Sequence, residues 1–478
     1  MKSKASIVAL FFSKFFPPIL NFIVFVYSAR ILDPESFGEV ALALTLIFLA
    51  SSLLPTGWRD SLFKIDILTK EIVSTVIWFH VLVSVIVIFF MLLFFNVFKF
   101  DFYSENINNM IVLLFVKVFF DCFVNVYNTL CVKYEFYFQL ALRTMICTCS
   151  SAITVYVLLQ LNFGVWALVF SQIAISLFGF VFLYSKFKSQ TIVHFDLDVI
   201  KDMYQFAMPV TFVNGFTNFF IQAESFVVGS FLGVKELGFF NLSKRLYDII
   251  VDIFISTINE ISLSKISKNI NDIDADKGLS FIKLTAITWW LMLPLIFLAF
   301  YFSDIFFDVL FTKKWTESIV IFKYFCAVAL IVSLGVPQRN FIILSGGANS
   351  LSKIQVLVAV VSIPTYMILA SYSMDYFLYS LVFFKFISYM SSFILMRTYI
   401  DFSLSSYFKV LFNSLLSLFF ANCISYFLIM ERIDNVYACT IIYSSSMMMF
   451  YFVFLELFSR RFKIIPSAGN FTFLTIIR

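Results

Sequence analysis

The chain has 478 residues, of which 61% are hydrophobic and only 13% are charged, and its mean hydropathy is +0.96. This composition excludes a soluble globular protein and indicates a chain that crosses a membrane many times. The formal net charge of +5 is small, and membrane orientation explains it without a nucleic-acid partner.

Apolar runs long enough to cross a hydrocarbon core recur throughout the chain. Because lipid offers backbone groups no hydrogen-bond partner, runs of about 20 residues without strand alternation are expected to be helices. The pattern predicts an all-α polytopic membrane protein with about fourteen transmembrane helices, over residues 5–29, 37–55, 72–97, 109–131, 144–161, 164–185, 204–230, 237–258, 279–302, 317–336, 353–373, 376–396, 408–430 and 435–458. Any chemistry is therefore expected at membrane depth.

Lysine and arginine are unevenly shared between the two sets of connecting segments. If the N-terminus is cytoplasmic, the segments on that side hold 21 basic residues, whereas the opposite side holds Arg30, Lys99, Lys235, Lys313, Lys314 and Arg432. Cytoplasmic loops carry the excess of lysine and arginine, so this bias predicts that both termini are cytoplasmic.

A short polar turn occurs twice, at residues 29–42 and again at 229–242. Three residues of the first copy recur at the same offset in the second, Leu32, Gly38 and Leu42 as Leu232, Gly238 and Leu242. Each turn follows the first helix of a set of six, and six is an even number, so both sets enter from the same side and form a parallel repeat. We predict an N-terminal lobe over 1–190, a C-terminal lobe over 191–400, and two further helices with a cytoplasmic tail over 401–478.

Proline marks the first predicted helix of each lobe, as Pro17 and Pro18 near Asn21 and as Pro209 near Asn214. Proline inside a helix frees backbone carbonyls, which are tolerated where the helix lines protein or water. These helices are interpreted either as bent helices facing a lumen or as ordinary kinked helices.

Charged residues inside the predicted spans are the main candidates for a functional site, because each needs a partner, a water-filled cavity or a route to the interface. Lys117 and Asp121 are four residues apart and share one helix face, where they can neutralise each other as a structural or a functional pair. A second stripe of mixed charge in the eighth helix favours a hydrated cavity and consists of Lys244, Asp248 and Asp252, with Arg245 beside it.

The other cations have two interpretations each. Lys14 is expected either to line the lumen or to extend to the cytoplasmic face, while Lys323 and Lys385 are candidate cavity residues. Arg30 and Arg59 are either interface anchors or phosphate-binding groups at opposite mouths of the pathway, since a guanidinium binds phosphate through two parallel hydrogen bonds.

Four carboxylates are candidates for coupling transport to an ion gradient, because burial can make a carboxylate take up a proton. They are Asp121, Glu224, Asp248 and Asp252. With only His80 and His194 in the chain, no metal-ligand cluster is expected. No catalytic motif and no Walker motif occurs, so no cofactor and no ATP is expected.

Three segments carry a family likeness. They are Ala-Arg-Ile-Leu-Asp-Pro-Glu-Ser-Phe-Gly at 29–38, Gly-Ser-Phe-Leu-Gly-Val-Lys-Glu-Leu-Gly at 229–238 followed by Ser-Lys-Arg-Leu-Tyr at 243–247, and Leu-Phe-Thr-Lys-Lys-Trp at 310–315. The chain resembles bacterial polysaccharide-transport proteins, the oligosaccharide repeat-unit flippases of the multidrug/oligosaccharidyl-lipid/polysaccharide (MOP) exporter superfamily. The charged pair Arg59 and Asp60 departs from the small-residue loop that relatives often carry there.

The resemblance implies a flippase and not an enzyme. It implies movement of a polyprenyl-diphosphate-linked oligosaccharide, such as an O-antigen, capsule or exopolysaccharide unit, from the cytoplasmic to the periplasmic leaflet by alternating access, driven by a proton or sodium gradient. The protein is then expected in the bacterial inner membrane, as a monomer, with a polysaccharide polymerase and a chain-length regulator as candidate partners in lipopolysaccharide or related synthesis.

Two alternatives stay open. A drug/cation antiporter of the same superfamily is disfavoured because bases at least match acids within the spans. A membrane polysaccharide polymerase or ligase is expected to have a larger periplasmic loop with clustered charged residues.

Overall fold

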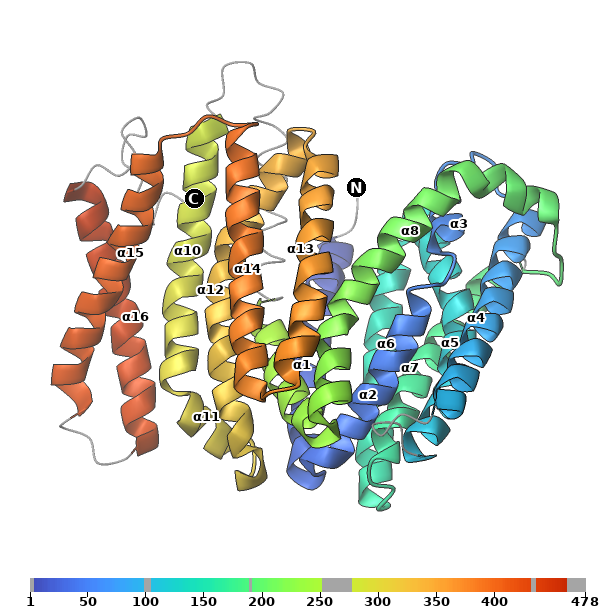
Figure 1. The fold of residues 1–478 in the computed structure, drawn as a ribbon, viewed down its shortest axis with the longest axis horizontal. Helices are drawn as coiled ribbons and strands as arrows, with labels where there is room; N and C mark the ends of the chain where they lie inside the picture. The colour runs from blue at the N-terminus through green and yellow to red at the C-terminus, as the bar shows by residue number, and fades with distance from the viewer. Residues whose placement is uncertain (1–3, 99–104, 189–190, 252–276, 431–435, 462–478) are drawn as a thin grey trace. The chain divides into compact units, whose positions relative to one another are not determined.

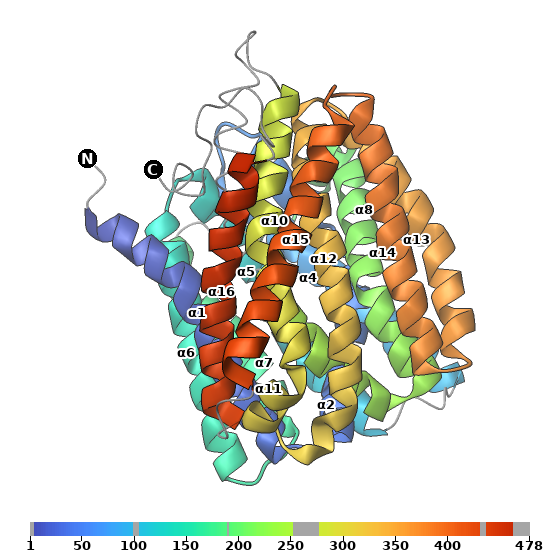
Figure 2. The ribbon, with the colours of Figure 1, turned by 90° about the vertical axis from the view of Figure 1, so that its left-hand side faces the viewer.

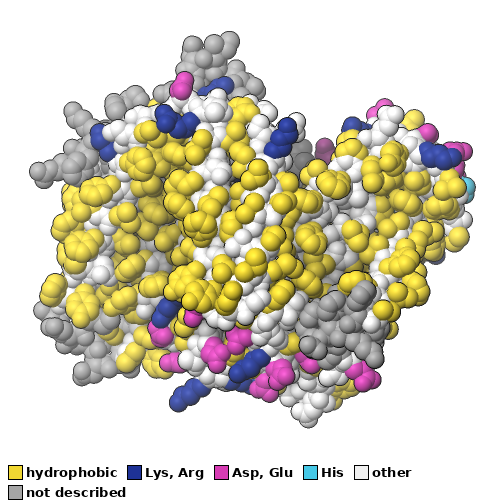
Figure 3. Space-filling model, viewed as in Figure 1, with side chains coloured by type: hydrophobic (Ala, Val, Ile, Leu, Met, Phe, Trp, Pro, Cys, Tyr) yellow, Lys and Arg dark blue, Asp and Glu magenta, His cyan; other side chains and the backbone are white. Residues whose placement is uncertain are grey.

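The structure is a computed structural model and describes residues 4–98, 105–188, 191–251, 277–430 and 436–461 (Figure 1). Every regular element of this described part is helical, which confirms the predicted all-α polytopic membrane fold with about fourteen spans. Eleven of the described helices are long and apolar enough to cross a membrane. The face seen in Figure 3 carries hydrophobic side chains along the middle of these helices, whereas Lys, Arg, Asp and Glu gather toward the helix ends.

The chain divides into two compact units. Unit 1 comprises Met1–Leu242, Leu310–Trp315 and Tyr366–Met374, and unit 2 comprises Ser243–Val309, Thr316–Thr365 and Asp375–Arg478. Unit 1 therefore extends beyond residue 190, the predicted end of the N-terminal lobe, and includes the residues up to Leu242. The lobe boundaries expected from the repeat stay a prediction.

The described part of unit 1 contains eight complete α-helices and a short π-helical continuation, with bounds α1 Lys4–Ile31, α2 Pro34–Ser51, α3 Thr56–Ser61, α4 Lys70–Phe98, α5 Glu105–Lys133, α6 Tyr137–Gln160, α7 Trp166–Phe187, α8 Leu197–Val227 and η2 Val228–Leu232. A further helix over 234–251 starts in unit 1. An apolar core of unit 1 joins α3, α4, α5, α7 and α8 through buried residues that include Trp58, Val76, Tyr127, Leu183 and Ala207. Both α1 and α8 continue through their internal prolines.

The polar turn at 29–42 ends one helix and starts the next. Asp33 precedes α2 in an extended conformation and Pro34 occupies the first helical turn, where a missing N–H costs nothing because those donors have no intrahelical acceptor. In the second copy, Gly233 has φ of +100°, a conformation that glycine adopts far more readily than other residues, and the following helix starts at Val234. The two helices thus begin at equivalent positions of the repeat.

The remaining described helices have the bounds α10 Lys277–Tyr301, α11 Ser303–Leu310, η3 Lys313–Trp315, α12 Thr316–Leu344, α13 Ala348–Ala370, α14 Met374–Arg397, α15 Leu404–Ser425, η4 Tyr426–Met430 and α16 Val436–Arg461. Except for the last residue of α11, η3, the end of α13 and the first residue of α14, which belong to unit 1, they belong to unit 2. α15 and α16 run beside α10 (Figure 2). Tyr407 of α15 stacks on Phe281, and Tyr443 of α16 stacks on Tyr301, so both C-terminal helices belong to the core of this unit.

Some predicted element boundaries were wrong. α12 passes through Pro337 and ends at Leu344, beyond the predicted end at 336, and α8 begins at Leu197, seven residues earlier than predicted. The short helices α3 and α11 fall where only loops were expected. In each case a polar or proline-containing stretch continues or starts a helix because neighbouring helices pack against it, which hydropathy alone does not register.

Candidate functional site

A partly buried ion pair lies in α5 within unit 1. The Lys117 ammonium contacts the Asp121 carboxylate one helical turn away, with side chains 12% and 28% exposed, which confirms the pairing expected from their spacing. Ser176 of α7 donates a hydrogen bond of 2.6 Å to the second carboxylate oxygen. The Lys117 nitrogen also lies 6.0 Å from the centre of the Phe48 ring of α2. We call Lys117, Asp121 and Ser176 the Lys117 cluster.

The Lys117 cluster holds a cation and an anion at membrane depth at low cost, because each charge has a partner. A charge without a partner would cost a few kcal/mol in a span, roughly 2.5–3.5 on insertion scales, so the pairing allows both residues to stay inside the bundle. Asp121 is the more exposed of the two side chains. Sequence reasoning missed Ser176, because a serine in an apolar span gives no signal of its own.

Arg59 lies in α3 and pairs with its neighbour. Its guanidinium is 2.9 Å from Asp60, both side chains being 26% exposed. Asn214 of α8 donates to the other oxygen of Asp60 at 3.1 Å and to Thr56 at 3.3 Å. The charged loop that departs from the family pattern is therefore a polar contact between α3 and α8, close to Pro209.

Arg30 lies in the last turn of α1 and donates from Nε to the backbone carbonyl of Leu310 at 2.8 Å. Next to it, Lys314 forms an ion pair of 3.0 Å with Asp33. These contacts join the turn at 29–38 to the segment 310–315, two of the three segments that carry the family likeness.

Trp315 joins all three of those segments. It is fully buried and donates its indole N–H to the carbonyl of Ala29 at 2.7 Å. Its ring packs edge-on against Phe37 at 5.4 Å and against Phe239 at 6.1 Å, from the first and second copies of the repeated turn. The sequence showed the three motifs as separate turns, and only their packing reveals one cluster.

The charged stripe of the eighth predicted helix lies on the helix over 234–251. Lys244 and Asp248 are half-buried and Arg245 is exposed, all within unit 2. On the same helix Ser243 donates to the carbonyl of Ser318 at 2.7 Å, which seats this segment against α12. Asp252 lies outside the described residues, and the hydrated cavity expected beside the stripe stays a prediction.

The remaining predicted residues are dispersed. Lys323 of α12 forms an ion pair of 3.0 Å with Asp304 of α11, with side chains 33% and 64% exposed. Lys385 in α14 and Glu224 in α8 are half-buried. The side chain of Lys14, in α1, lies outside the described part. The structure thus places Lys117, Asp121, Arg30, Arg59 and Glu224 in unit 1 and the other described candidates in unit 2.

Unit 2 contains a buried polar centre that sequence reasoning did not identify. The hydroxyls of Tyr389 and Tyr407 are 2.8 Å apart, and Gln338 is fully buried. The side chain of Gln338 lies close enough to both hydroxyls to interact with them, whereas neither amide atom of Asn413 has a hydrogen-bond partner among the described residues. Single polar residues in apolar spans form no sequence pattern from which such a centre could be predicted.

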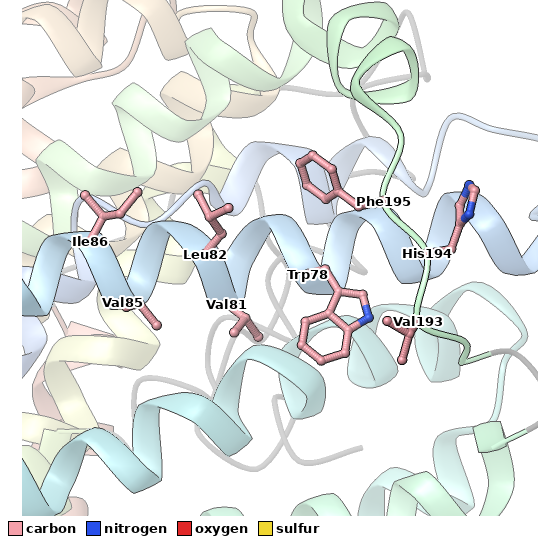
Figure 4. Close-up of a pocket in the computed structure, with 8 residues that line it drawn as sticks. All are labelled: Trp78, Val81, Leu82, Val85, Ile86, Val193, His194 and Phe195. Carbon is pink, nitrogen blue, oxygen red and sulfur yellow. The ribbon is translucent and has the colours of Figure 1, made fainter.

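An apolar groove of about 450 Å³ lies on the outside of α4 (Figure 4). The linker after α7 forms its second wall, held to α4 because Ile192 accepts from Trp78 at 3.2 Å and donates to Ser74 at 2.9 Å. The groove is lined by Trp78, Val81, Leu82, Val85, Ile86, Val193, His194 and Phe195. Its lining suits hydrocarbon and not a charged head group, and it contains no residue of the Lys117 cluster.

The family model described as polysaccharide biosynthesis protein matches residues 28–320, a range that begins at the first repeated turn and ends just beyond Trp315. The chain belongs to this family. No curated protein matches the sequence of this family member.

Solved structures share the fold of this polysaccharide biosynthesis family protein. The lipid II flippase MurJ in an inward closed conformation has a TM-score of 0.72 at 15% identity, over 95% of this chain and 100% of that one. An inward-facing multidrug resistance MATE family transporter of the MOP superfamily has a TM-score of 0.62 at 12% identity, over 80% and 94%. A MATE structure in complex with MaD3S has a TM-score of 0.51 at 13% identity, over 82% and 94%. The protein is thus a multi-pass membrane protein with the fold of MOP superfamily transporters.

Proposed function

We propose that the protein is a flippase that moves a polyprenyl-diphosphate-linked oligosaccharide repeat unit from the cytoplasmic to the periplasmic leaflet of the bacterial inner membrane by alternating access. The observation that carries the proposal is the Lys117 cluster, a cation held at membrane depth in a member of the polysaccharide biosynthesis family. The transporter fold supports the proposal, because moving a lipid between leaflets is a transport process that requires no catalytic group.

A diphosphate head group is an anion, and Lys117 is a suitable partner for it. In the described state Asp121 neutralises Lys117 and is itself held by Ser176. A head group that reaches Lys117 therefore replaces Asp121, and the displaced carboxylate needs a new partner, which the coupling ion can provide. This exchange would couple substrate binding at Lys117 to a proton gradient through Asp121.

The other candidate residues complete the proposed pathway. Lys244, Arg245 and Lys14 would contribute to head-group binding, with Lys323 and Lys385 as further cations, while Arg30 and Arg59 would stand at the two mouths. Glu224, Asp248 and Asp252 are alternative coupling carboxylates to Asp121, with sodium as the alternative ion. The sugars would be those of an O-antigen, capsule or exopolysaccharide unit.

The contrast with a drug/cation antiporter lies in the charge of the site. A binding site for cationic drugs favours an acidic group without a nearby base, whereas the carboxylate of Asp121 is already neutralised by Lys117. This arrangement favours an anionic substrate.

The decisive experiment is complementation of a bacterial strain that depends on this copy for surface polysaccharide. Lys117→Gln, and Lys244→Gln combined with Arg245→Gln, are expected to abolish surface polysaccharide and to accumulate the lipid-linked unit, because the head group loses its cations. Lys201→Gln serves as the matched control, since Lys201 pairs with Asp198 on an exposed surface, where the side chains are 73% and 83% exposed.

Normal polysaccharide in both charge variants, at normal protein level, would exclude these residues from the site. If the wild-type protein fails to restore polysaccharide but lowers the accumulation of a cationic dye, the antiporter assignment replaces the flippase.

A further inference from the structure

The two copies of the repeated turn meet each other in unit 1. A Cβ added at Gly38 would overlap the backbone carbonyl of Val234, and a Cβ added at Gly238 would overlap the backbone carbonyl of Pro34. Residues 34 and 38 of the first copy thus face residues 234 and 238 of the second in reciprocal fashion. The contact, which we call the Gly38 contact, has the pattern of a local two-fold axis between the repeats.

Glycine is required on both sides of the Gly38 contact because the helix backbones touch. Small residues allow such close approach between membrane helices, and any side chain here would push the helices apart. One turn further along α2, Leu42 is fully buried, and its side chain lies 2.9 Å from where a Cβ of Gly229 would stand. The contact therefore continues along the first two turns of α2.

A second close backbone contact through two glycines lies at the other end of α2. A Cβ at Gly57 would overlap the backbone carbonyl of Ala207, and a Cβ at Gly215 would overlap that of Ser52. The Gly57 amide also donates to the Thr211 hydroxyl at 2.8 Å. We call this the Gly57 contact. α8 and its continuation thus pack on α2 and α3 at both ends.

We propose that Gly38, Gly238, Gly57 and Gly215 are positioning residues that set which side of the transporter is open. The described structure has both contacts closed. Alternating access requires each mouth to open in turn, so one contact separates while the other stays closed. From the predicted orientation, the Gly38 contact closes the periplasmic mouth and the Gly57 contact closes the cytoplasmic mouth. This inference rests on the part of the proposed function that concerns alternating access, and it does not depend on which substrate is carried.

Alanine at these glycines is the direct test, because a methyl group excludes the closed contact and leaves the open one unaffected. Gly38→Ala with Gly238→Ala should favour the state open at the Gly38 contact, and Gly57→Ala with Gly215→Ala the opposite state. Gly335→Ala is the matched control, since a Cβ at Gly335 would meet no atom of the described residues within 4 Å.

The readout is maleimide labelling in a cysteine-free background of single cysteines at the two contacts, Leu42→Cys and Ser52→Cys, which are 0% and 6% exposed in the described structure. The Gly38 and Gly238 variant should raise labelling at position 42 roughly tenfold, as expected when a minor open state becomes the major one, and leave position 52 unchanged. The Gly57 and Gly215 variant should do the reverse. Both variants should stop transport at normal protein level.

Labelling at wild-type levels at both positions in both glycine variants would overturn the proposal. A rise at both positions together would also overturn it, because general loosening has no preferred side. Labelling needs no substrate, so a failure here is separable from a failure of the flippase assignment, which the polysaccharide assay alone decides.

Discussion

Both ends of α2 contact a neighbouring helix through glycines, but the side chains around the two contacts differ in polarity. At the Gly38 contact the glycine pair is covered by aromatic rings, with Trp315 between Phe37 and Phe239. At the Gly57 contact the cover is polar, with Asn214 bonded to Asp60 beside Arg59. Backbone contact through glycine is common to both, and what surrounds it differs.

That difference indicates how each end would open. Separating the aromatic rings loses packing that water does not replace. Separating Asp60 from Asn214 instead frees polar groups that can form hydrogen bonds with water or with a polar head group. In the predicted orientation the polar end faces the cytoplasm, the side from which a charged head group would enter. The Gly57 contact is therefore expected to open more readily in the presence of an anion.

Removal of the buried tryptophan at each end should have the largest effect. Trp315 donates to Ala29, and Trp58 of α3, 5% exposed, donates to the carbonyl of Ile200 at 3.1 Å. Trp315→Ala and Trp58→Ala should each lower the free energy of unfolding by about 3–5 kcal/mol, because a large buried ring leaves a cavity. Thermal unfolding in detergent measures the loss. Labelling should rise at position 42 for Trp315→Ala and at position 52 for Trp58→Ala, and a rise at the wrong position would break the comparison.

The polar cover of the Gly57 contact should contribute less. Asp60→Asn removes the partner of Arg59 while an amide oxygen still faces Asn214, so the expected cost is about 1 kcal/mol for a quarter-exposed pair. Labelling at position 52 should increase modestly and labelling at position 42 should not change. Asn214→Ala should reproduce this pattern, and equal effects at both positions would argue against a local role.

The surface ion pair at the Gly38 contact should contribute least. Lys314 and Asp33 are 30% and 74% exposed, and such pairs contribute about 0–1 kcal/mol and weaken with salt. Lys314→Gln should therefore leave labelling at position 42 nearly unchanged, because the aromatic cover and the glycines hold the contact. A large increase in labelling at position 42, reproduced by high salt in the wild type, would show that the ion pair also holds the Gly38 contact closed.

The helices and one ion pair were predictable because their causes are local. A long apolar run must form a helix in lipid whatever its neighbours are, and residues four apart on a helix share a face, so the Lys117–Asp121 pairing followed from spacing. The charged stripe over 234–251 was placed on one helix in the same way, while its surroundings needed information that spacing does not hold. The short helix α3 and the passage of α12 through Pro337 depend on packing and were missed.

The membrane class, the helix order and the duplicated turn follow from the residues alone, since hydropathy and repeat spacing act along the chain. The packing of the helices was needed to show that the two turns contact each other, that Trp315 joins them to a third motif, and that Ser176 completes the Lys117 cluster. Each of these three features depends on contact between segments tens to hundreds of residues apart. A glycine or a serine reveals which backbone or carboxylate it faces only when the helices are packed.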